Sequence, residues 1–307
     1  MKKSLALLLF ALCLLFPGLL SAGTAAPQPR LVAIGAPAVE ILCALGLGDR
    51  LIARSSWETF PPSILSLPEI GSPYQPNLER LLLLKPDLVL LDGRLGPLAG
   101  QMERYGIKTL SVEAYNPSEV IPAVRRLAER FGSKERGEEL IGDLLRIAET
   151  TKNITRHIPE EKKATGVMLT GLTDQFCVAP ESGCTLLEDA GARNLAAGTG
   201  QPFPLISREW LVSRSPDFLL VPEKKSESSE HKREAFQRKF SRVMAGRGRI
   251  LFMEEELTFG LRSFLGTCRL AAELYPGSVQ PESFETMMNG FMNKYFFQCS
   301  GEEKAAP

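Results

Sequence analysis

Few residues in this 307-residue sequence have the types and spacing that catalysis requires. The chain contains no GxSxG nucleophile motif, no GxxxxGK[ST] phosphate loop, no GxGxxG motif and no HExxH zinc motif. Its two histidines, His157 and His231, lie at the end of a predicted helix and in a charged run, and neither follows a buried strand. We therefore predict no catalytic residue, and no site for a bare metal ion built from histidine.

Two glutamates, in contrast, recur within the same sequence frame. Glu79 stands in LERLLLLKPDLVLL and Glu209 in REWLVSRSPDFLLV. The glutamates differ by 130 in residue number, and so do Pro86 and Pro216. Each segment predicts a short helix, a Pro-Asp pair that ends it, and a buried strand. An acidic residue in the first turn of a helix interacts favourably with the helix dipole, so a purely structural role is the alternative to binding.

The elements around this repeat predict an α/β fold with mostly parallel sheets. Short apolar runs indicate strands, and between them lie helical patterns that begin with Pro or a cap and end at Gly or Pro. The predicted strands are 30–35, 88–91, 107–113, 164–170, 218–221 and 249–253. The predicted helices are 38–48, 78–84, 98–106, 185–191, 208–214, 265–277 and 283–298.

Residues 117–160 carry apolar residues at helical spacing, with many charges and no strand between them. We expect one long helix, or two abutting helices with a break near Gly132. This linker separates an N-terminal lobe (27–116) from a C-terminal lobe (161–299), which a disordered tail (300–307) follows. In folds of this kind, ligands bind outside the carboxyl ends of the strands, at the crevice between lobes.

The first 26 residues predict a cleaved signal peptide. Lys2 and Lys3 precede an apolar run, which ends in the small residues of 21–26. No cysteine ends that run, so we expect no lipid anchor. The equal numbers of basic and acidic residues, 36 each, argue against a nucleic-acid partner, and we expect a monomer. After removal of the signal peptide five cysteines remain: Cys43, Cys177, Cys184, Cys268 and Cys299. Cys177 and Cys184 flank a short loop and either form a disulfide or stay unpaired.

Several segments, taken in order, resemble one family. It comprises the extracytoplasmic solute-binding proteins of ABC importers that take up cobalamin, haem and ferric siderophores (class III, with a single linker helix). The resemblance covers nearly all of the mature chain and rests on RLVAIGAPAVEILCALGLGDRLIA, SSWETFPP, IGSPYQPNLERLLLLKPDLVLL, FPLISREWLVSRSPDFLLV and YPGSVQPESFETMMNGFMNKYFF. It implies two Rossmann-like lobes joined by one long α-helix, a periplasmic location, and a pre-chelated iron or cobalt complex as ligand.

The resemblance also assigns roles to individual residues. It implies that Glu79 and Glu209 dock onto arginines of the two permease subunits, one from each lobe. It implies ligand contacts from Trp57, Tyr74, Phe176, Phe203 and Arg262, for which packing in loops is the alternative.

Two of these assignments are chemically specific. Cobalamin-binding members have a tryptophan before the NLER segment, where this chain has Pro73 beside Tyr74. As a phenolate, Tyr74 could ligate a haem iron. Arg262 could pair with a propionate, a phosphate or a siderophore oxygen, or instead cap its own helix at the surface.

We expect from these patterns a binding protein that hands a metal chelate to an ABC-type permease dimer. Two alternatives stay open at this point. One is a secreted α/β enzyme that uses the same crevice, and the other is a ligand sensor that is not coupled to transport.

Overall fold

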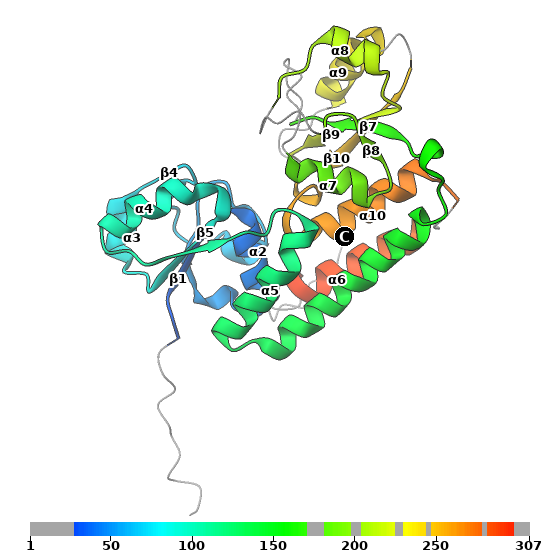
Figure 1. The fold of residues 1–307 in the computed structure, drawn as a ribbon. Coiled ribbons are helices and arrows are strands. Elements are labelled where there is room, and N and C mark those ends of the chain that lie inside the picture. The colour runs from blue at the N-terminus through cyan, green and yellow to red at the C-terminus, as the bar shows by residue number, and fades with distance from the viewer. Residues whose placement is uncertain are drawn as a thin grey trace, which may run out of the picture.

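Two lobes with similar architecture lie on either side of a helical connection (Figure 1). A computed structural model describes residues 28–170, 181–197, 204–224, 230–243, 247–277 and 281–297. The predicted signal peptide, the predicted tail and the candidate residues Phe176 and Phe203 lie outside these ranges.

The N-terminal lobe contains a four-stranded parallel sheet in the order β2-β1-β5-β6. Its central strands β1 and β5 are buried throughout, as expected for strands with helices on both faces. The strands are β1 (Leu31–Ile34), β2 (Leu51–Ala53), β5 (Leu88–Asp92) and β6 (Thr109–Val112). The helices are α2 (Ala36–Ala44), α3 (Leu78–Leu84) and α4 (Gly96–Arg104), and β3 (Gly71–Ser72) forms a hairpin with β4 (Gln75–Pro76).

The C-terminal lobe repeats this topology with the order β10-β9-β7-β8, again all parallel. In the N-terminal lobe β1 pairs with β2 and β5, and β6 lies at the edge beside β5. In the C-terminal lobe β7 pairs with β8 and β9, and β10 lies at the edge beside β9. The strands are β7 (Thr165–Met168), β8 (Arg193–Asn194), β9 (Phe218–Glu223) and β10 (Arg249–Glu254). The helices are α7 (Glu181–Asp189), α8 (Arg208–Arg214), α9 (Glu230–Val243) and α10 (Ser263–Leu274). The prediction of two α/β lobes with parallel sheets is confirmed.

The 130-residue repeat is structural as well as sequential. Helices α3 and α8 each span seven residues. The side chain of Asn77 accepts the backbone N–H of Arg80 at the start of α3, and the hydroxyl of Ser207 accepts that of Trp210 at the start of α8.

Both helices also end in the same way. The residues before the prolines, Lys85 and Ser215, adopt the left-handed conformation with φ of 48° and 44°. The carboxylates of Asp87 and Asp217 then each accept, at 2.7 Å, a backbone N–H at or just before the first strand of their own lobe, from Arg30 and Thr165. The Pro-Asp pair therefore ends the helix and ties the start of the strand that follows it to the first strand of the lobe.

The linker consists of two helices, α5 (Pro117–Phe131) and α6 (Lys134–Thr155). The break lies at Gly132, whose φ is 75°, so the second of the two predicted arrangements is the one observed. The two helices pack closely, because a Cβ on Gly137 of α6 would lie 2.4 Å from the Cβ of Ala128 of α5. Helix α6 then continues to the C-terminal lobe, where it packs against α10.

The end of the chain forms a second connection between the lobes. Helix α11 (Pro281–Met292) continues into the π-helical turn η7 (Asn293–Phe297), which contacts α2 of the N-terminal lobe. The Phe296 ring lies 4.8 Å from that of Phe60, and the hydroxyl of Tyr295 donates to Asp143 of α6 at 2.5 Å. The segment assigned to the C-terminal lobe therefore also covers α6 and reaches the other lobe.

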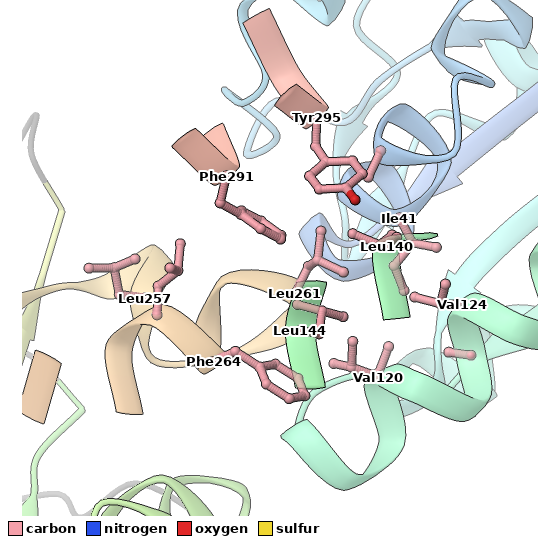
Figure 2. Close-up of a cluster of buried hydrophobic side chains, with 14 of the residues drawn as sticks. Ile41, Val120, Val124, Leu140, Leu144, Leu257, Leu261, Phe264, Phe291 and Tyr295 are labelled. Carbon is pink, nitrogen blue, oxygen red and sulfur yellow. The ribbon is translucent and has the colours of Figure 1, made fainter. Parts of the chain in front are cut away.

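The largest hydrophobic core crosses from one lobe to the other. Figure 2 shows side chains from both lobes and from the linker facing one another in this cluster. Two smaller clusters lie within the single lobes. The labelled members of the shared core are Ile41, Val120, Val124, Leu140, Leu144, Leu257, Leu261, Phe264, Phe291 and Tyr295.

Within the described part of the chain, no helix combines the length and apolar character needed to cross a lipid bilayer. Of the five cysteines discussed above, Cys43 and Cys268 are buried thiols in the hydrophobic core.

Candidate functional site

Loops at the carboxyl ends of the two sheets meet between the lobes. The ammonium group of Lys224, just after β9, lies 5.3 Å from the ring centroid of Trp57, which follows β2. Tyr115, after β6, stacks on Phe259, after β10, with centroids 5.1 Å apart and an interplanar angle of 10°. The backbone N–H of Gly260 donates to the carbonyl of Tyr115 at 2.7 Å. These contacts lie beyond the carboxyl ends of parallel strands, which is where folds of this class bind ligands.

Trp57 and Tyr74 form an exposed aromatic pair in this region. Their ring centroids are 5.3 Å apart in an edge-to-face arrangement. Their exposed fractions are 57% and 66%, high for large aromatic side chains, which usually bury most of their surface. Tyr74 lies in the turn between β3 and β4, so the hairpin holds it beside the loop that carries Trp57. The structure therefore brings together two of the residues predicted to contact the ligand.

A buried carboxylate shapes the loop that carries Trp57. The two oxygens of Glu58 accept the backbone N–H of Gly35 at 3.0 Å and that of Ser55 at 2.8 Å. These N–H groups follow β1 and β2, so Glu58 ties the ends of the two strands together. Glu58 is only 3% exposed, and burial raises the pKa of its carboxyl group.

Arg94 supplies a second cation–aromatic contact. Its guanidinium lies 3.7 Å from the Tyr115 ring centroid and forms two hydrogen bonds with Asp92, at 2.9 and 2.7 Å. Half of the Arg94 side chain remains exposed, so one face of the stack reaches solvent.

Four residues of this region were not predicted from the sequence: Lys224, Arg94, Tyr115 and Phe259. A usable signal existed, because each stands within a few residues after the end of a predicted strand. Folds of this class place their ligand contacts at those positions.

Arg262 was expected either to contact the ligand or to cap its own helix at the surface, but it is buried against another helix. It is 8% exposed and binds Glu40 of α2 through two hydrogen bonds, at 2.7 and 3.1 Å. Its guanidinium also lies 4.2 Å from the ring centroid of Phe60. The surface-capping alternative is therefore wrong, and the groups that would have bound a ligand acid already bind Glu40. The reason is that the turn η6 (Gly260–Arg262) packs on α2, where the buried Glu40 needs a counter-charge.

Glu79 and Glu209 are exposed in the first turns of α3 and α8. These two helices lie at the outer ends of their lobes, away from α6 (Figure 1). Hydrogen bonds from its own backbone N–H and from the Ser207 hydroxyl lower the pKa of Glu209, which keeps this carboxylate charged.

Among the described residues, no group of three or more His, Cys, Asp or Glu side chains is arranged to hold a metal ion.

A family model, described as periplasmic binding protein, matches residues 31–242, which is more than half of the chain. The chain belongs to the periplasmic binding protein family. It is therefore a substrate-binding protein, and the alternative of a secreted enzyme is wrong.

Similar proteins agree with this family. The binding protein is 30% identical to the vitamin B12-binding protein of Pectobacterium atrosepticum over 213 residues, which cover 66% of this chain and 74% of that protein. The periplasmic heme-binding protein of Roseiflexus sp. RS-1 is 25% identical, with a TM-score of 0.69 over 82% of this chain and 100% of that one. A periplasmic heme-binding protein of Pseudomonas aeruginosa is also 25% identical, with a TM-score of 0.69 over 82% of this chain and 94% of that one.

Proposed function

We propose that this binding protein captures a metal chelate between its lobes and delivers it to an ABC-type permease dimer. The ligand class is a haem, a corrinoid or a ferric siderophore. The observation that carries the proposal is the exposed Trp57–Tyr74 pair, which lies where the strand ends of the two lobes meet and faces Lys224. The names of the similar proteins, which bind vitamin B12 and heme, support the same ligand class.

The chemistry of these side chains suits the outside of a chelate. Aromatic rings pack on the flat, conjugated face of a macrocycle, and each Å² of apolar surface buried contributes about 25 cal/mol before association costs. Lys224 carries the positive charge that an acidic group on the ligand edge would need, whereas the charge of Arg94 is already balanced by Asp92. The metal then arrives already chelated, and Tyr74 is the described residue that we propose as a ligand if the metal is a haem iron.

Delivery depends on the outer ends of the lobes. In this proposal Glu79 and Glu209 bind arginines on the two permease subunits, one lobe to each subunit.

The protein reaches the periplasm through a cleaved signal peptide, residues 1–26, and works there as a monomer without a lipid anchor.

Direct titration tests the ligand class. Haemin, cyanocobalamin and a ferric hydroxamate siderophore are added in turn to the purified protein, and binding is followed by absorbance and by tryptophan fluorescence. We expect Trp57→Ala to weaken binding of the preferred chelate by roughly tenfold or more, since about 1.4 kcal/mol of lost contact has that effect.

Tyr105→Ala is the matched control, because Tyr105 is 56% exposed but follows α4, at the amino end of the sheet. If none of the three chelates binds, or if Trp57→Ala binds as tightly as the wild type, the ligand proposal fails. Loss of a tyrosinate–iron absorption band in Tyr74→Phe would identify Tyr74 as an iron ligand.

A separate experiment tests delivery. Glu79→Lys/Glu209→Lys should bind the chelate with unchanged affinity but no longer stimulate ATP hydrolysis by the cognate permease complex. If the loaded wild-type protein does not stimulate the permease, the sensor alternative holds.

A further inference from the structure

Each outer helix exposes an apolar side chain beside its glutamate. Leu82 of α3 is 41% exposed and Val212 of α8 is 54% exposed. They also differ by 130 in residue number, so they occupy equivalent positions of the repeat. Each stands three residues after its glutamate, a spacing that places both side chains on the same side of a helix.

Poor packing of the two helices does not explain this exposure. The residues one position earlier, Leu81 and Leu211, are both 0% exposed and lie in the cores of their lobes. The helices are therefore seated in the same orientation, with Leu82 and Val212 turned outward.

The exposed apolar side chains are also concentrated at these ends. Ten large hydrophobic residues of the described chain are exposed, and four of them lie on α3, on α8 or just before α8: Leu82, Leu83, Leu205 and Val212. Trp57 and Tyr74, at the proposed ligand site, account for two more. Exposed apolar side chains that gather in one place mark interaction surfaces.

We propose that each lobe docks through a composite surface, made of the glutamate carboxylate and the apolar side chain next to it. The pairs are Glu79 with Leu82 and Glu209 with Val212. The matching partner is a dimeric membrane protein that presents, once in each subunit, an arginine or lysine beside an apolar hollow. This inference rests on the proposed function, since it describes how the same permease is recognised.

The arrangement of the two surfaces favours that partner. Among the described residues, neither Glu79 nor Glu209 forms an ion pair, so both carboxylates are available to cations. Two equivalent surfaces, one per lobe, fit two equivalent subunits.

The apolar part also has an energetic role. An exposed carboxylate–cation contact contributes little in water and is screened further by salt. Burial of apolar surface contributes to binding without any charge, so salt does not screen it in this way. Docking that persists in salt would therefore need Leu82 and Val212.

The experiment measures binding of the chelate-loaded, full-length protein to its cognate permease complex in nanodiscs, at low and at high ionic strength. We expect Leu82→Ser/Val212→Ser to weaken docking by roughly tenfold at both ionic strengths. We expect Glu79→Gln/Glu209→Gln to weaken it at low ionic strength but to approach the wild type at high ionic strength. Leu145→Ser is the matched control, because Leu145 is 51% exposed on α6, away from both outer helices.

Three outcomes separate the inference from the proposed function. The inference is supported if Leu82→Ile/Val212→Leu docks like the wild type while the serine variant binds chelate normally and docks weakly. It is overturned if the serine variant docks normally while the glutamine variant does not, and the proposed docking then stands. If both variants dock normally, the inference and the assignment of Glu79 and Glu209 fail together.

Discussion

At the scale of single residues, Glu58 shows how a buried acidic side chain supports an exposed residue of the proposed ligand site. Its carboxylate accepts hydrogen bonds from the backbone N–H groups of Gly35 and Ser55. These bonds hold the loop that contains Trp57, the residue before Glu58. Arg54 donates to the backbone carbonyl of Glu58 but forms its ion pair with Glu69. Burial is therefore only partly offset, and the pKa of Glu58 is raised.

This raised pKa predicts a pH dependence of stability. Between the ordinary value of 4.5 and the higher folded value, the unfolded chain has released the Glu58 proton while the folded protein keeps it. The free energy of unfolding contributed by Glu58 therefore falls as the pH rises through this window. Urea unfolding at pH 4 to 7 should show the wild type losing stability relative to Glu58→Gln as the pH rises. A difference that is constant, or that changes in the opposite direction, would contradict the assignment.

At the scale of elements, the contact between α2 and η6 joins the lobes through one buried ion pair. Glu40 is 2% exposed and Arg262 is 8% exposed, so both charges depend on each other for compensation. The same turn supplies the N–H of Gly260 to Tyr115, whose ring stacks on Phe259. The turn that carries Arg262 therefore also contributes a contact to the proposed ligand site.

Removing one partner of this pair should be much more costly than removing both. We expect Arg262→Met alone to lower the free energy of unfolding by about 3 to 5 kcal/mol, because it leaves a charged Glu40 buried. Glu40→Met/Arg262→Met should cost less than the sum of the two single substitutions. Chemical denaturation of the four proteins measures the coupling, and additive effects would show that the two residues act independently.

At the scale of the whole molecule, the two lobes do not hinge on one helix. The core in Figure 2 runs from α2 through α5 and α6 to α10, and α11 with η7 adds a second connection. Close-packed cores of this kind do not deform continuously. A large closure on ligand binding would require breaking this shared core.

We therefore predict a small change of shape. The radius of gyration from solution X-ray scattering should differ by less than about 1 Å between the empty and the chelate-bound protein, as in other pre-organised binding proteins. The same samples, checked by absorbance for full occupancy, provide the control. A compaction of several Å would mean that the lobes move as separate bodies.

The repeated unit of each lobe could be predicted from the sequence. Asn77 and Ser207 as caps, Pro86 and Pro216 as stops, and the buried strands that follow act through neighbouring backbone groups, so their effect can be read locally. The glycine at the break between α5 and α6 is a signal of the same kind. The short strands β2 and β8, of three and two residues, were not predicted, because so few residues show no periodic pattern.

The contacts between the lobes could not be predicted from the sequence. Arg262 faces Glu40, which is 222 positions away, and Lys224 faces Trp57 on the other lobe. No local pattern encodes such pairs, because they depend on how the shared core sets one sheet against the other. The sequence shows the chemical type of each side chain. Whether that side chain is free to bind a ligand depends on residues that are far away in the sequence but close in the folded protein.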